Sequence, residues 1–330
     1  MSPNYTLPQA LEDQVYASVQ GLLFFNSVTV FISALAFALS IKGLWDERDS
    51  MKKLGWADLL RNDAFQIRVL ITLINGVALV YLLVSLILYM TLPDALTPDL
   101  CSNLTNWCNY LYAIFYEVFY IFLLKKAFVI YKTEHKTNFL YRLAMLIAFA
   151  GPVIAMPVFI GLNVSQGYGL ILFGFCYDVF NNADTFIYYL VIILVLAFAY
   201  LYVFAAPIIS QARVIKGSNA SQALKLLNIA KKNAMLTGVS MFFQIGTAIL
   251  FLVVTEIYTV EIIYVSQVAT LVSLVDVSVS SICVMLMTNA WMPKSMRHIF
   301  KEATDSDSLS LHTTSPRPES RMIAVVAVGP

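Results

Sequence analysis

Charged side chains are scarce in this sequence. Asp, Glu, Lys and Arg together make up 12% of the 330 residues, whereas 59% of the residues are apolar. Soluble domains usually carry roughly 25% charged residues, and here the few charges cluster between long apolar stretches. A single helical bundle in a lipid bilayer is therefore expected in place of soluble domains.

Signatures of catalysis are missing as well. The three histidines, His135, His298 and His312, all fall in polar segments between or after the apolar stretches. No catalytic Ser/His/Asp or Cys/His set, metal-ligand spacing or Gly-rich phosphate loop can be assembled. We therefore expect no enzyme activity, no cofactor, no metal site and no nucleic-acid partner.

Two further absences concern membrane insertion and internal symmetry. Residues 1–13 lack Lys, Arg and a short apolar run, so we expect no cleavable signal peptide and a first helix that directs its own insertion. The first three apolar stretches do not repeat in the last three, which disfavours transporters built from triple-helix repeats.

Seven stretches are apolar and approach the length of about 20 residues that a spanning helix needs. They are Val15–Ile41, Ile67–Leu92, Trp107–Leu124, Leu143–Leu162, Thr185–Ser210, Met235–Thr255 and Ile262–Met292. The third and fourth are the shortest, but both are still long enough to cross a bilayer. The predicted fold class is an all-α membrane protein, a seven-transmembrane-helix bundle.

The basic residues predict the orientation of this bundle. All 21 Lys and Arg residues fall between stretches one and two, three and four, or five and six, or after stretch seven, with Arg68 at the very beginning of stretch two. The opposite side carries acidic residues but no basic one. Because basic residues accumulate on the cytoplasmic side, the N-terminus should lie outside and the C-terminal tail in the cytoplasm, with the protein in the plasma membrane as a multi-pass protein.

The bundle divides the chain into four parts. Residues 1–14 are the expected extracellular N-terminus, and residues 15–292 the seven-helix domain. Residues 293–302 form an expected amphipathic juxtamembrane helix that lies on membrane lipid. Residues 303–330 are disordered by composition and offer candidate phosphorylation sites for a phosphorylation-dependent binding partner at Ser306, Ser308, Ser310, Thr313 and Thr314.

Glycosylation motifs and cysteines favour the same orientation. Three N-x-Ser/Thr motifs lie on the side without basic residues, at Asn4, Asn103 and Asn163. Cys101, Cys108 and Cys176 lie on that side too, where disulfides form. Three cysteines allow three single pairings, and the sequence alone does not choose among them.

Two carboxylates, Glu117 and Asp276, lie near mid-depth within the apolar stretches. A charged carboxylate at a helix centre costs at least ~2.5–3.5 kcal/mol and usually marks a functional site. Apart from Arg68, the second residue of the second stretch, no Lys, Arg or His lies within the seven stretches, and none lies near mid-depth. Each acid must therefore be protonated, held by neutral donors such as Gln244, or paired with an ion or ligand. A purely structural role, in which a protonated acid is hydrogen-bonded inside the bundle, remains open for both.

Aromatic residues concentrate in the third stretch. Tyr112, Phe115, Tyr116 and Phe119 follow the spacing of one helix face. Such a face is more often core than ligand cage. Alternatively, these aromatics line an outward-facing pocket, for which the candidate ligand-binding residues are Glu117, Asp276, Tyr112, Tyr116, Gln244, Tyr264 and Gln267.

The layout resembles that of G-protein-coupled receptors. Seven helices, an outer N-terminus, cysteines at the top of helix three and in the second outer loop, and an amphipathic helix after helix seven carry the resemblance. It implies a Cys108–Cys176 disulfide. If Cys108 is the helix-three cysteine, the Asp-Arg-Tyr triplet of the rhodopsin-like class would fall near residues 132–134, where this chain reads Lys-Thr-Glu. The Cys-Trp-x-Pro and Asn-Pro-x-x-Tyr motifs of that class are absent.

A second resemblance is local. The segment Asp276-Val277-Ser278-Val279-Ser280 is similar to helix seven of microbial rhodopsins, whose retinal-binding lysine would take the place of Ser280. The resemblance implies an opsin-related protein without a retinal Schiff base.

The leading functional interpretation is a cell-surface receptor that couples an unknown extracellular ligand to a cytoplasmic partner, with a G protein as the expected partner. The alternatives are an ion- or proton-coupled transporter that uses Glu117 and Asp276, and the opsin-related protein. We further expect the two acids to lie close together and to titrate as a coupled unit, because two carboxylates in an apolar interior cannot both ionise cheaply.

Overall fold

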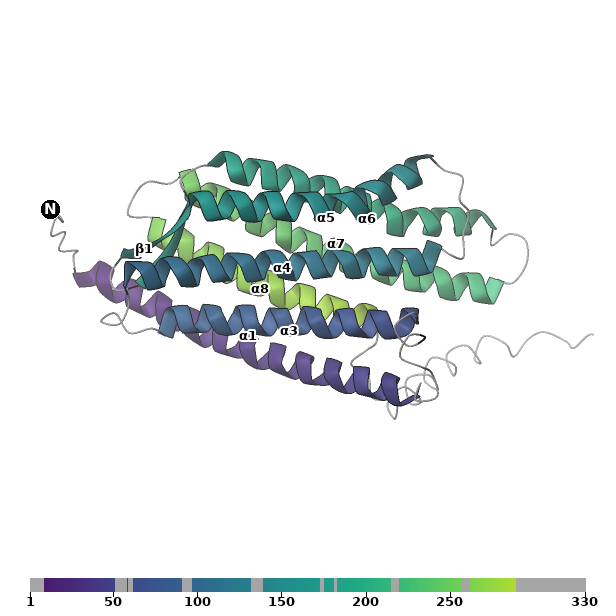
Figure 1. The fold of residues 1–330 in the computed structure, drawn as a ribbon, viewed down its shortest axis with the longest axis horizontal. Coiled ribbons are helices and arrows are strands. Elements are labelled where there is room, and N and C mark those ends of the chain that lie inside the picture. Colours follow the sequence, from purple (N-terminus) through teal and green to yellow (C-terminus); the bar gives the residue numbers. More distant parts are fainter. Residues whose placement is uncertain are drawn as a thin grey trace, which may run out of the picture. The chain divides into compact units, whose positions relative to one another are not determined.

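The computed structural model describes residues 9–50, 58, 62–90, 97–131, 139–172, 175–180, 183–214, 220–256 and 262–288, all of which lie in one compact unit, Met1–Trp291. Seven helices run side by side through these ranges (Figure 1). They are α1 (Gln9–Ser50), α3 (Asp63–Met90), α4 (Pro98–Tyr131), α5 (Phe139–Gln166), α6 (Ala183–Val214), α7 (Ala220–Glu256) and α8 (Ile262–Thr288). A short hairpin of β1 (Gly167–Leu172) and β2 (Phe175–Phe180) follows α5.

Five of these helices are long and apolar enough to cross a membrane: Val19–Asp46, Asp63–Leu88, Pro98–Phe128, Lys231–Val253 and Gln267–Thr288. The shortest has 22 residues, about 33 Å at 1.5 Å per residue, which matches a hydrocarbon core of about 30 Å. Shorter apolar stretches occur in α5 and α6, at Phe139–Ile154 and Leu190–Ala206. The chain is therefore a helical, multi-pass membrane protein.

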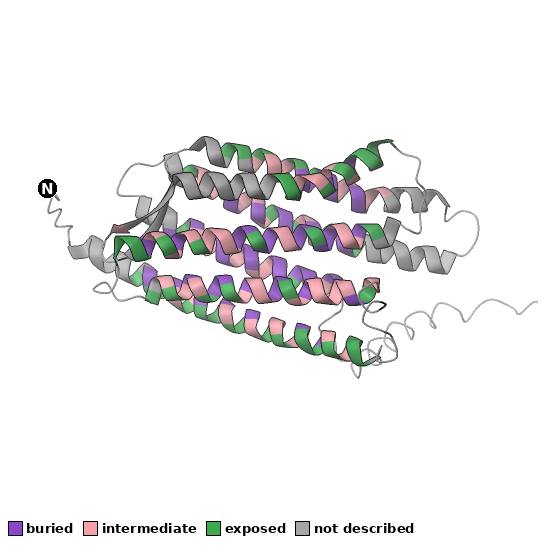
Figure 2. Ribbon diagram, viewed as in Figure 1, coloured by how far each residue is buried: buried purple, intermediate pink, exposed green. Residues whose placement is uncertain are grey.

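The outer surface of the bundle is apolar, as a lipid-facing surface must be. Phe24, Phe198 and Phe242 are each at least 70% exposed although each belongs to a long apolar helix. Figure 2 shows exposed residues alternating with buried ones along the helices, so that each helix has one face toward its neighbours.

The helices pack largely in chain order. α1 packs on α3, α3 on α4, α4 on α5, α5 on α6, α6 on α7 and α7 on α8, and α8 closes the bundle against α1 and α3. The aromatic face of α4 forms the centre of the core, as the interpretation of these aromatics as core residues predicted. Phe115, Tyr116, Phe119 and Tyr120 on α4 are all fully buried.

A proline in α5 explains one of the contacts between helices. Pro152 has no N–H, so the carbonyl oxygen of Ala148 loses its usual helical donor. The hydroxyl of Tyr200 on α6 donates to that oxygen at 2.8 Å and lies 3.1 Å from the Tyr120 carbonyl oxygen on α4. Tyr200 thereby satisfies a backbone group that could find no water in lipid and links α4, α5 and α6.

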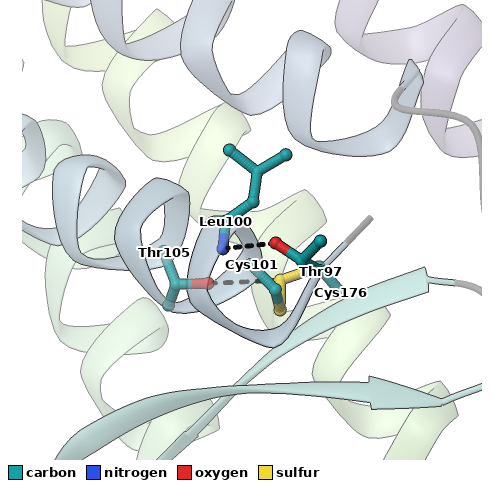
Figure 3. The surroundings of a disulfide bond; sticks show 5 residues. All are labelled: Thr97, Leu100, Cys101, Thr105 and Cys176. Atoms are coloured by element: carbon teal, nitrogen blue, oxygen red, sulfur yellow. Dashed lines mark hydrogen bonds between the residues drawn. A yellow bond between two sulfur atoms is a disulfide. The ribbon is translucent and has the colours of Figure 1, made fainter. Parts of the chain in front are cut away.

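The hairpin is bonded to the start of α4 by a disulfide. Cys101 on α4 pairs with Cys176 on β2 (Figure 3). Both cysteines are buried beside Leu88 and Ile171. The Cys108–Cys176 pairing that the receptor resemblance implied is therefore wrong. Cys108 lies two turns further along α4, with its sulfur 3.7 Å from the Ser85 hydroxyl on α3.

The axial position of the hairpin decides between the two cysteines. The Thr97 hydroxyl accepts the Leu100 N–H at 3.2 Å, which caps the beginning of α4 (Figure 3). Cys101 lies in this first turn, level with β2, and the Thr105 hydroxyl one turn later is 3.5 Å from the Cys176 sulfur. Because the hairpin also packs against α3 and α8, the disulfide fixes β2 near the ends of three helices.

Candidate functional site

Asp276 on α8 is the centre of the candidate site. Its carboxyl group is fully buried and is surrounded by hydroxyl groups. The Tyr112 hydroxyl donates to Oδ2 at 2.8 Å, and the Thr247 hydroxyl lies 3.4 Å from the same oxygen. The Ser280 hydroxyl approaches Oδ1 at 3.5 Å, and Tyr116 also interacts with the carboxyl group. One side chain thereby connects α4, α7 and α8 through neutral donors alone.

The face of α7 toward this site is polar from Asn233 to Thr247. Its members recur at steps of four and three residues and are all at most 1% exposed: Asn233, Thr237, Ser240, Gln244 and Thr247. Fourteen residues separate the first from the last, about 21 Å along the helix. Ser240 hydrogen-bonds to Ser280, and the Tyr120 hydroxyl donates to Oε1 of Gln244 at 2.7 Å.

α8 carries a matching polar face that reaches α3. The Tyr81 hydroxyl of α3 lies 2.9 Å from the Ser273 hydroxyl. Ser281 donates to the side-chain oxygen of Asn75, whose amide nitrogen donates to the Ile71 carbonyl at 2.8 Å. We call these hydrogen-bonded groups and the polar faces of α7 and α8 the polar seam. It joins four helices by directional bonds.

The part of the seam nearest the beginning of α7 is poorly satisfied. Both side-chain polar atoms of Asn233 and the hydroxyl of Thr237 are buried without a hydrogen-bond partner, and so is the amide nitrogen of Gln244. Buried polar groups normally find partners, and a missing bond costs about 1–3 kcal/mol.

Glu117 does not belong to the polar seam. Successive residues turn by about 100° around a helix, so Glu117 on α4 points about 140° away from Tyr112 and about 100° away from Tyr116. Its electrostatic neighbour is Tyr200 on α6, whereas the interactions of Asp276 are with hydroxyl groups. The predicted coupled pair of acids is therefore not formed, and each acid has its own neutral surroundings.

Of the other predicted ligand-binding residues, three lie in the seam or beside it and two lie near the beginning of α8. Tyr112, Tyr116 and Gln244 lie in the seam or beside it. Gln267 is buried on α8, nine residues from Asp276 or about 13.5 Å along the helix. Tyr264 lies on α8, but its side chain is outside the described residues.

Several members of the seam were not predicted as site residues. Thr247, Ser240, Ser273 and Tyr81 are the main ones. The signal that could have identified the α7 members is the regular spacing of polar residues in an otherwise apolar stretch.

Basic residues gather at the end of the bundle that the sequence predicts to be cytoplasmic. Lys125 on α4 forms an ion pair with Asp63 on α3, at 2.6 Å. The Lys126 ammonium lies 3.4 Å from the Met287 carbonyl of α8 and near enough to Lys232 and Arg68 for charge repulsion. Three helices thus bring positive charge together beside the inner end of the seam.

The predicted modification sites are only partly within the described residues. Asn103 is exposed in the second turn of α4. Asn163 lies near the end of α5, with its side chain outside the described residues. Asn4, the 293–302 segment and the five candidate phosphorylation sites also lie outside them.

No known protein-family model matches this sequence, and no curated protein sequence does either.

Proposed function

We propose that this protein is a seven-helix receptor of the plasma membrane, with the N-terminus outside and the tail in the cytoplasm. It would couple an extracellular ligand to a cytoplasmic partner, with a G protein as the first to test. The observation that carries the proposal is the fully buried Asp276 carboxyl, which connects α4, α7 and α8 through hydroxyl groups alone.

The geometry at Asp276 suits a switch between two helix arrangements. Only the Tyr112 bond is short, whereas the Thr247 and Ser280 hydroxyls lie 3.4 and 3.5 Å from the carboxyl oxygens. A change of charge at Asp276 would alter all three contacts together. Because they belong to three helices, it would change the relative free energies of two packings of the bundle.

Two features at the ends of the bundle support a path from outside to inside. The disulfide-anchored hairpin packs against α3, α4 and α8, three of the four helices that share the polar seam. Lys126 on α4 and Arg68 on α3 lie at the other end of two of these helices. A ligand at the hairpin would thus act on the helices that present positive charge to a partner.

The Cys101–Cys176 disulfide also changes the comparison with receptors. When Cys108 is taken as the helix-three cysteine, the Asp-Arg-Tyr triplet would fall at residues 132–134. When Cys101 takes that place, the same distance along the chain leads to residues 125–127, where the chain reads Lys125-Lys126-Ala127. A basic residue then takes the central place of the triplet, and its backbone contact to α8 keeps it inside the inner end of the bundle.

Ligand-independent activation of G proteins tests this proposal without knowledge of the ligand. The purified protein in nanodiscs would be incubated with a panel of heterotrimers, and nucleotide exchange would be measured. We expect exchange above that of empty nanodiscs, altered severalfold by Asp276→Asn and lowered by Lys126→Ala. Exchange equal to empty nanodiscs with every heterotrimer, for all three proteins, would contradict it.

Ion-coupled transport is the second candidate, because a buried acid in a span is also the usual centre of a proton or cation pathway. A reconstituted transporter would show pH- or Na⁺-driven flux across liposomes that Asp276→Asn abolishes. The receptor proposal predicts no flux for either protein. The same liposome preparation therefore separates the two candidates.

A further inference from the structure

Glu117 lies on the face of α4 that turns away from the bundle. Ile114 is one turn before it and Ile121 one turn after it, about 60° and 40° away around the helix. Both isoleucines are 43% exposed, and Glu117 itself is partly exposed. The acid therefore sits at the lipid-facing side of its helix, near the middle of the candidate span Pro98–Phe128.

The residues around Glu117 form a regular stripe. Its members alternate at steps of three and four, as positions a and d of a heptad repeat do, and all are exposed or partly exposed: Trp107, Tyr110, Ile114, Glu117, Ile121, Leu124 and Phe128. We call these seven residues the α4 outer stripe. It covers 21 residue steps, about 31 Å, which is the depth of the hydrocarbon core. Among its seven members, the only ionisable carboxyl is that of Glu117.

The bundle does not satisfy this carboxyl group. Its Oε2 atom is buried and has no hydrogen-bond partner. The neighbouring Tyr200 has a single hydroxyl proton, which is directed at the carbonyl oxygens of Ala148 and Tyr120. Tyr200 therefore has no proton to donate to Glu117. A carboxylate at this depth costs at least ~2.5–3.5 kcal/mol, so its surroundings in the isolated chain are incomplete.

A second copy of the chain cannot supply a cation to the Glu117 carboxyl group. The nearest basic residue of α4 is Lys125, eight residues away or about 12 Å along the helix. The other basic residues belong to the segments at the predicted cytoplasmic ends of the helices. Two copies that met along this stripe would bring Glu117 against Glu117 and no positive charge.

We infer that the α4 outer stripe is the docking surface for a transmembrane helix of another membrane protein, and that this helix carries a Lys or Arg at mid-depth. The heptad spacing fits a left-handed crossing of two helices, with apolar residues in contact on both sides of the pair. The single acid at a d position would fix the register, because only one alignment brings the basic residue to Glu117. The inference does not depend on receptor activity.

Binding of a model helix tests this surface with the full-length protein. The protein would be labelled with an acceptor fluorophore in phosphatidylcholine vesicles and mixed with donor-labelled Leu/Ala peptides that span the bilayer. One peptide carries a single central Lys, and a matched peptide carries Leu in its place. Interhelical polar contacts in membranes predict that the Lys peptide binds about 5- to 30-fold more tightly.

The variants separate the acid from the apolar stripe. Glu117→Leu should reduce the preference for the Lys peptide to about onefold, and Glu117→Gln, which keeps a hydrogen-bonding group, should leave a smaller preference. Phe242→Leu changes a different exposed surface, on α7, and should keep the preference of the wild type. Because Glu117→Gln is nearly isosteric, it keeps the test decisive if Glu117→Leu fails to fold.

Two results would overturn the inference. The first is equal binding of the Lys and Leu peptides by the wild-type protein. The second is self-association of the protein in the absence of peptide that is lost in Glu117→Leu, since this would assign the stripe to a second copy of the chain.

Discussion

The two membrane-depth acids of this protein have opposite surroundings. Asp276 is fully buried and has hydroxyl groups from α4, α7 and α8 around it. Glu117 is partly exposed between two lipid-facing isoleucines, and one of its oxygens has no partner. Depth in the membrane is therefore a poor guide to the role of an acid. The side of the helix on which it lies determines whether it holds the bundle together or faces another molecule.

Replacement of each acid by leucine should reveal the largest difference in stability between the two sites. Asp276→Leu leaves the Tyr112, Thr247 and Ser280 hydroxyls without their acceptor and should lower the free energy of unfolding by about 2–4 kcal/mol. Glu117→Leu removes a carboxyl that the bundle does not satisfy and should leave stability unchanged or higher. Reversible unfolding in mixed micelles would measure both. Equal losses for the two variants would contradict the assignment of the acids to different surroundings.

Removal of a single tyrosine hydroxyl from α4 compares the surroundings of Asp276 with the α4 outer stripe. Tyr112→Phe deletes the 2.8 Å bond to Asp276 and should cost about 1–3 kcal/mol, because the acceptor is a buried carboxyl. Tyr110→Phe, a matched change on the α4 outer stripe, should cost less than about 0.5 kcal/mol. In the Asp276→Asn background the Tyr112→Phe cost should fall, as a double-mutant cycle would show. An unchanged cost there would mean that the tyrosine acts through packing alone.

A smaller effect is expected at Tyr200. If its hydroxyl serves the carbonyl that Pro152 leaves free, Tyr200→Phe should cost about 1–2 kcal/mol in the wild type. In a Pro152→Ala background the helix regains its own donor, and the Tyr200→Phe cost should fall by about half or more. Binding of the Lys peptide at Glu117 should be the same in Tyr200→Phe and the wild type. A loss of peptide preference would show that Tyr200 supports Glu117 directly.

The sequence was sufficient for properties that depend on distance along a helix. Axial counting at 1.5 Å per residue placed both acids near mid-depth, and apolar stretches located the helices. The helices extend beyond the predicted stretches, as α4 does from Pro98 to Tyr131, because a helix continues into the polar region where side chains are hydrated. The burial of Tyr112 and Tyr116 also followed from the helical spacing of the α4 aromatics.

Properties that depend on the direction around a helix were harder to predict. In lipid the outward face of α4 is as apolar as the inward face, so hydrophobicity does not distinguish Ile114 from Phe115. Glu117 was therefore expected to lie close to Asp276, whereas it lies between the exposed Ile114 and Ile121 on α4. The choice of disulfide failed for a related reason: Cys101 and Cys108 are seven residues apart and share one face of α4. Only the axial position of the hairpin, which the sequence did not predict, distinguishes the two cysteines.

The most direct test of the two-acid account is chemical labelling of the unmodified protein in its membrane. A lipid-soluble carbodiimide reaches carboxyl groups from the hydrocarbon phase, and mass spectrometry of the digested protein locates the adduct. Our account predicts an adduct on Glu117, absent in Glu117→Gln, and none on Asp276, which is fully buried. Labelling of Asp276 in preference to Glu117, or labelling of both to the same extent, would contradict it.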